Sequence, residues 1–119
     1  MHILKLSRIV SSVCSNESSN FSLQTLGDFL TSDTRALHFI KNIFHEGKIN
    51  DIGFNMSHLL IGDDNITLTS LYFYDGLDPF KTTKQKFLFI LDQWEKFLLS
   101  NNQELIITED NGDFSFEMK

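Results

Sequence analysis

The clearest pattern of apolar and polar positions lies in residues 83–99, where it predicts a long amphipathic helix. Apolar side chains recur there at intervals of three and four and form one stripe over roughly three turns, made of Phe87, Ile90, Leu91, Trp94, Phe97 and Leu98. Thr82 and Gln85 have the spacing of a capping box at its start. We expect the stripe to pack on a sheet.

The N-terminal segment is more ambiguous. In residues 1–14, apolar side chains such as Ile3 and Leu6 follow helical intervals, and we interpret the segment as a helix. Its β-branched residues keep a strand open as the alternative. Residues 15–20 are polar and predict a loop.

Two further helices are predicted before residue 50. Ser22 is positioned to cap a short helix over residues 23–30. The next helix begins at residue 32 or 33 and continues to about Glu46, with apolar positions at intervals of three and four. Gly47 follows it, at the position where glycine commonly ends a helix.

The rest of the chain carries strand patterns. Residues 65–71 alternate apolar and polar side chains, which is typical of a strand with one solvated face. Residues 62–65 predict a hairpin loop, and Asn111-Gly112 predicts a second hairpin between apolar runs at 105–108 and 114–118. We therefore expect an α+β fold, in which N-terminal helices accompany an antiparallel sheet crossed by one long amphipathic helix, ending in a β-hairpin.

The composition fits one folded domain over residues 1–119. Hydrophobic residues make up 41% of the chain, which is enough for a core, and one proline and six glycines leave little room for a flexible linker. The one cysteine, Cys14, cannot form an internal disulfide, so nothing indicates an oxidising compartment. No apolar run reaches the length of about 18 residues that a spanning helix needs, and no signal-peptide pattern is complete. We expect a cytoplasmic protein without a membrane span.

Charge is distributed unevenly along the chain. The net charge of −6 at pH 7 and the pI near 5.0 have the wrong sign for a general nucleic-acid binder. Residues 49–78 contain five aspartates and no lysine or arginine, and residues 99–119 contain five acidic residues against one lysine. If these stretches join one sheet, its loops and open face form a negative surface that favours a basic protein partner.

No motif in the sequence predicts a catalytic or metal site. The histidines and the cysteine lack the ligand spacing of a zinc site, and residues 62–65 lack the ligand positions of a calcium loop. Asp92 and Glu95 are explained best as a solvated helix face, with Lys96 four residues after Asp92. We expect no cofactor, no metal ion and no enzymatic activity.

The C-terminal half resembles a known family. The segment LYFY at residues 71–74 is followed by a turn, by the tryptophan-bearing segment FLFILDQWEKFL at 87–98 and by ELIITEDNG at 104–112. This order of strand, helix and terminal hairpin is similar to that of small immunity proteins of bacterial contact-dependent growth inhibition and related polymorphic toxin systems. The resemblance implies a cytosolic, non-enzymatic protein that binds and blocks one cognate toxin domain, frequently a nuclease with a basic active-site surface.

The predicted interface consists of acidic and tyrosine side chains that would cover a basic toxin cleft. Carboxylates pair with lysine or arginine, and tyrosine supplies apolar area with a polar tip. The candidates are Asp63, Asp64, Tyr72, Tyr74, Asp75 and Asp78, with Glu109, Asp110 and Asp113 as a second patch. Two other functions stay open: a small enzyme or ligand-binding domain with dispersed site residues, and a subunit of a larger cytosolic assembly.

Overall fold

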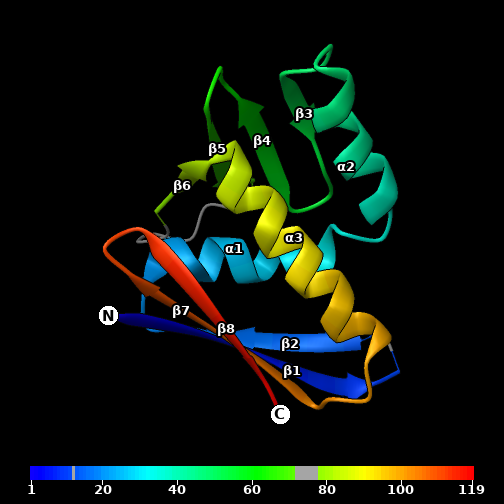
Figure 1. The fold of residues 1–119 in the computed structure, drawn as a ribbon, viewed down its shortest axis with the longest axis vertical. Helices are drawn as coiled ribbons and strands as arrows, with labels where there is room; N and C mark the ends of the chain where they lie inside the picture. The colour runs from blue at the N-terminus through cyan, green and yellow to red at the C-terminus, as the bar shows by residue number, and fades with distance from the viewer. Residues whose placement is uncertain (12, 72–77) are drawn as a thin grey trace.

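The computed structural model describes residues 1–11, 13–71 and 78–119, which form three helices and two four-stranded antiparallel sheets (Figure 1). The first sheet has the strand order β2-β1-β7-β8, with β1 at His2–Val10, β2 at Val13–Glu17, β7 at Glu104–Asp110 and β8 at Asp113–Met118. The second sheet has the order β3-β4-β5-β6, with β3 at Asp51–Gly53, β4 at Ser57–Ile61, β5 at Asn65–Ser70 and β6 at Phe80–Thr83. The two ends of the chain therefore share one sheet, and its middle forms the other.

The helices lie between and across the two sheets. They are α1 at Phe21–Ser32, α2 at Leu37–Glu46 and α3 at Lys84–Leu99. In Figure 1, α1 lies between the sheets and α3 crosses in front of it, from the second sheet towards the first. α1 contacts β1 and β2 of one sheet and β5 and β6 of the other. The α+β class, the long helix and the terminal hairpin are confirmed, but the strands form two sheets where the sequence predicted one.

α3 is the long helix that the sequence predicts. Its buried side chains belong to the apolar stripe: Phe87, Ile90, Leu91, Trp94 and Phe97. Leu98 is half-buried against the same core, and α3 contacts β5 and β6 as well as β8. The cap lies one residue later than predicted. Thr82 pairs with Ile66 in the second sheet, and the Thr83 hydroxyl accepts the Lys86 N–H at 3.1 Å.

The terminal hairpin is confirmed, with Asn111 and Gly112 as its turn. Both residues have positive φ, 53° and 84°, which this two-residue turn requires. Asp110 and Asp113 face each other at the end of the ladder. The loop predicted over residues 62–65 likewise joins two antiparallel strands, β4 and β5.

The N-terminal segment is a strand, so the helix predicted for residues 1–14 is wrong. Leu4 and Leu6 are fully buried whereas Ile3 is 51% exposed, so burial alternates with a period of two. β1 pairs with β7 at the other end of the chain, which supplies the core contacts for its buried face. Part of the loop predicted over residues 15–20 belongs to β2.

Both N-terminal helices begin elsewhere than predicted. Asn20, not Ser22, caps α1, because its side-chain oxygen accepts a first-turn N–H at 2.9 Å. The next helix begins later than predicted, at Leu37. Asp33 instead ends α1, and both of its carboxylate oxygens accept the Met56 N–H. This bond ties the α1–α2 connection to the segment before β4.

Candidate functional site

The structure describes six of the nine residues predicted to contact a partner. They lie in the β4–β5 loop, before β6 and around the β7–β8 turn: Asp63 and Asp64, then Asp78, then Glu109, Asp110 and Asp113. The other three, Tyr72, Tyr74 and Asp75, lie outside the described residues.

The acidic residues do not form one continuous negative face. The condition for such a face, that both acidic stretches join one sheet, is not met, because β3, β4 and β5 belong to the second sheet and β7 and β8 to the first. Lysines of α3 lie between them. The Lys84 N–H donates to the Asp64 carbonyl at 2.8 Å, and Lys86 Nζ pairs with the Asp113 carboxylate at 2.9 Å. The first turn of α3 therefore separates the β4–β5 loop from the β7–β8 turn.

Several of these acids remain available to a partner. Four are exposed and have no side-chain partner among the described residues: Asp63, Asp64, Asp78 and Asp110. Glu109 differs, because its Oε2 accepts the Gly112 N–H at 3.3 Å and so stabilises the turn. The available acids thus lie on both sides of the start of α3.

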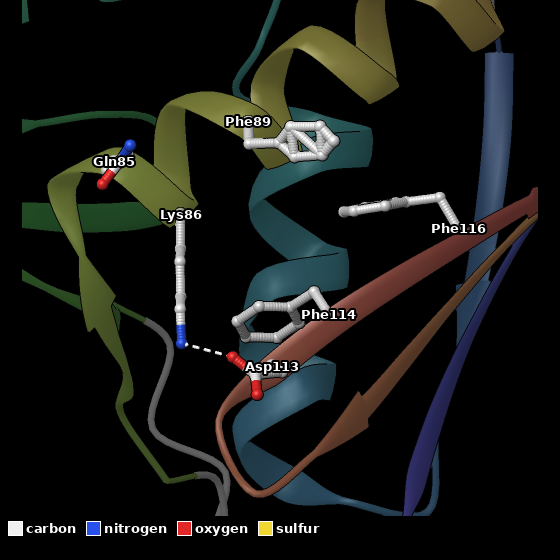
Figure 2. A pocket seen from close by; sticks show the side chains of 6 residues that line it. All are labelled: Gln85, Lys86, Phe89, Asp113, Phe114 and Phe116. Atoms are coloured by element: carbon white, nitrogen blue, oxygen red, sulfur yellow. Dashed lines mark hydrogen bonds and ion pairs between the residues drawn. The ribbon is translucent and has the colours of Figure 1, made fainter.

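A groove with aromatic walls lies between α3 and β8 (Figure 2). It encloses about 580 Å³ and is lined by Gln85, Lys86, Phe89, Asp113, Phe114 and Phe116. Phe89 of α3 meets Phe116 of β8 edge-on, with ring centroids 5.4 Å apart, and 47% of Phe89 is exposed. The charged groups of the groove, Lys86 and Asp113, pair with each other at its rim. Its shape and chemistry suit an apolar side chain.

The groove is not predicted from the sequence, although one signal for it is present. Phe89 falls outside the apolar stripe of α3 and is nevertheless a large aromatic residue. A single exposed aromatic residue is common on protein surfaces, so this signal alone does not identify a contact surface. Its neighbours Phe114 and Phe116 come from β8, and tertiary packing alone brings them to α3.

Other candidate reactive groups have structural surroundings. Lys41 forms ion pairs with Asp92 at 2.5 Å and with Glu95 at 3.1 Å, so these carboxylates join α2 to α3 instead of pairing with Lys96. Burial raises the pKa of the Cys14 thiol, which disfavours the nucleophilic thiolate. Across residues 1–11, 13–71 and 78–119, no three His, Cys, Asp or Glu side chains are placed to hold a metal ion.

Comparison with known proteins adds no relative. None of the protein-family models, curated proteins or solved structures compared with the chain matches it. Within the described part of the chain, no helix combines the length and the apolar character needed to cross a membrane.

Proposed function

We propose that this protein is a binding inhibitor and not an enzyme. It would act as an immunity protein that covers the basic active-site surface of a cognate bacterial toxin domain, with a nuclease as the expected class. The observation that carries the proposal is the placement of Asp63, Asp64 and Asp110, exposed and without side-chain partners in the described residues, around the start of α3. The order of elements in the C-terminal half, which resembles that of immunity proteins, supports it.

Exposed carboxylates without partners suit a basic protein for two reasons. They attract a basic surface before contact, which raises the association rate. They also need not leave an existing ion pair in order to bind, whereas Asp113 would have to leave Lys86. We therefore assign recognition first to Asp63, Asp64 and Asp110, and a smaller contribution to Asp113.

The aromatic groove supplies the apolar contact that charge alone does not provide. A few buried apolar or aromatic contacts usually dominate the binding energy of an interface. Phe89 is partly exposed beside Phe114 and Phe116, close to the β7–β8 turn that carries Asp110. An apolar toxin side chain would fill this groove while basic residues contact the neighbouring acids.

Co-expression with a candidate toxin domain, chosen from the genes adjacent to the one that encodes this chain, tests the proposal. We expect the wild-type chain to restore growth and to bind with an association rate that falls as salt rises. The reason is that the screening length shortens from about 10 Å at 0.1 M to about 3 Å at 1 M. Asp63→Lys and Asp64→Lys are each expected to slow association several-fold, measured by surface plasmon resonance.

Glu17→Lys is the matched control. It changes the net charge by the same amount. Glu17 is exposed, and its neighbour Asn16 points towards α1, so Glu17 points to the opposite, uncovered face of the first sheet. If Glu17→Lys slowed association as much as Asp63→Lys, the net charge of the chain and not this surface would determine binding. The absence of binding and of growth rescue by the wild-type chain would contradict the proposal.

A further inference from the structure

Strand β8 leaves one edge of the first sheet without a pairing strand. Lys119 exchanges both backbone hydrogen bonds with Glu104 at the end of the β7–β8 ladder, at 3.0 and 3.2 Å. Alternate residues of an antiparallel strand point their backbone groups to opposite sides. Phe114, Phe116 and Met118 therefore direct theirs away from β7, and no residue of 1–11, 13–71 or 78–119 bonds to them.

This edge lacks several features that usually keep an edge strand from pairing, namely short length, proline, a register shift and a covering helix. β3 and β6, also edge strands, have only three and four residues, and β2 contacts α1 and pairs with β1 through a register shift. β8 has six residues in unbroken register with β7 and no proline, and it lines the groove with Phe114, Phe116 and the Lys86-paired Asp113. An edge of this kind readily accepts another strand.

We propose that β8 pairs antiparallel with β8 of a second copy of this chain, which joins two first sheets across a two-fold axis at Phe116. The inference concerns the isolated chain and goes beyond the proposed function. In this register, Phe116 of each copy exchanges both backbone hydrogen bonds with Phe116 of the other, and Phe114 does so with Met118. The hydrogen-bonded pairs of the two strands are then all apolar.

Charged residues at alternate positions of β8 select this register, and Asp113 among them also pairs with Lys86 at the rim of the groove. Asp113 lies opposite Lys119 of the second copy, and Glu117 lies opposite Ser115. The neighbouring registers that use the same backbone groups are repulsive: one places Asp113 opposite Glu117, and the other places Glu117 opposite Glu117. Like charges directly opposite each other destabilise an antiparallel pair. The strand is thus complementary to itself in one register and repulsive in those beside it.

A disulfide cross-link tests the register. Ser115→Cys and Glu117→Cys are made in separate chains, each with Cys14→Ala, and both positions are exposed. In the proposed register they lie opposite each other with Cα atoms about 4.5 Å apart, which is within disulfide range. We expect an equimolar mixture to form disulfide-linked dimers in far higher yield than either variant alone, because neither residue lies opposite itself. Equal yields would overturn the register.

Sedimentation equilibrium tests the association itself. We expect a wild-type dimer, and dimerisation weakened about tenfold by Asp113→Lys, which places lysine opposite lysine twice. Adding Lys119→Asp should restore dimerisation, because residues 113 and 119 of one chain are about 20 Å apart and meet only between copies.

A monomeric wild-type chain would overturn the proposal. The edge of β8 could then pair only with a strand from a different protein. A failed rescue by Lys119→Asp would also overturn it. Failure to bind a toxin would leave these measurements unchanged, because they are made on the isolated chain.

Discussion

Arg8 holds the end of α3 through Phe97: its guanidinium lies 4.8 Å from the Phe97 ring centroid, and its Nη2 donates to the Phe97 carbonyl at 2.7 Å. The same side chain donates to the carbonyls of Ser100 at 3.3 Å and of Asn102 at 3.0 Å. The last carbonyls of a helix lack intrahelical donors and carry partial negative charge. A side chain of β1 therefore completes the C-terminus of α3 and ties the helix to the first sheet.

Arg8→Ala should lower the free energy of unfolding by about 2–3 kcal/mol, because charge-assisted hydrogen bonds and the ring contact are lost together. Arg8→Lys keeps the charge but not the forked donors, so we expect an intermediate loss. Urea unfolding followed by circular dichroism measures both. Arg35→Ala, at an exposed position, is the control. Equal effects of Arg8→Ala and Arg35→Ala would show that Arg8 does not support α3.

Trp94 should be the costliest single side chain of α3 to truncate. It is buried, stacks on Phe97 with ring centroids 5.6 Å apart, and donates its indole N–H to the Thr34 hydroxyl at 2.9 Å. Trp94→Ala should lower the free energy of unfolding by about 3–5 kcal/mol. Trp94→Phe keeps much of the apolar volume and should cost less. An unchanged urea midpoint for Trp94→Ala would contradict the packing of the stripe in the core.

The ion pairs of Lys41 should contribute to the contact between α2 and α3. Burial alone lowers the pKa of Lys41, but its hydrogen bonds with Asp92 and Glu95 outweigh burial and raise it. Lys41→Ala leaves the two carboxylates without their shared cation, and should lower the free energy of unfolding by about 1 kcal/mol. Lys96→Ala is the control, because Lys96 is exposed. If urea unfolding showed a larger loss of stability for Lys96→Ala than for Lys41→Ala, the predicted pairing of Lys96 with Asp92 would be favoured instead.

The elements that can be predicted from the sequence are those that local interactions determine. The stripe of α3 follows helical intervals over its whole length, and side chains within one helix contact each other without help from the rest of the chain. Asn111-Gly112 specifies its turn because both residues tolerate positive φ.

The elements that are wrong or missing depend on distant contacts. Leu4 and Leu6 are buried because β1 pairs with β7 and packs against α1, and a short apolar segment does not reveal that partner. β6 has four residues and exists through its pairing with β5. The net charge of the candidate surface also depends on how the chain folds. Lys86 neutralises Asp113 only because the fold brings α3 next to β8.

Asp33 should make stability depend on pH. Burial raises the pKa of its carboxyl, although hydrogen bonds with Met56 and Ser57 oppose this. The folded protein therefore keeps this proton to higher pH than the unfolded chain, where the pKa is about 3.9. The contribution of Asp33 to stability is greatest below that value and is lost as pH rises through the folded pKa. The stability of Asp33→Asn relative to wild type should thus increase from about pH 3.5 to pH 7.

Urea unfolding of both proteins at each pH measures this effect. Asp63→Asn removes the same charge from an exposed loop and is the control. Parallel profiles for wild type and Asp33→Asn would mean that Asp33 does not titrate abnormally in the folded state.

Gly27 should not tolerate alanine, because α1 lies close against side chains of the first sheet there. A Cβ at this position would lie 2.3 Å from Asn16 Oδ1 and 2.8 Å from a Leu4 methyl carbon. Asn16 Oδ1 is held by Gln24 Nε2 at 2.7 Å, so it does not move away without breaking that bond. Alanine is normally better than glycine inside a helix by about 1 kcal/mol, so any loss must be steric. Gly27→Ala should lower the free energy of unfolding by about 1–3 kcal/mol. Gly53→Ala, whose Cβ would meet no atom within 4 Å, should change it little. Wild-type urea midpoints for both variants would show that α1 packs less closely on the sheet than these distances require.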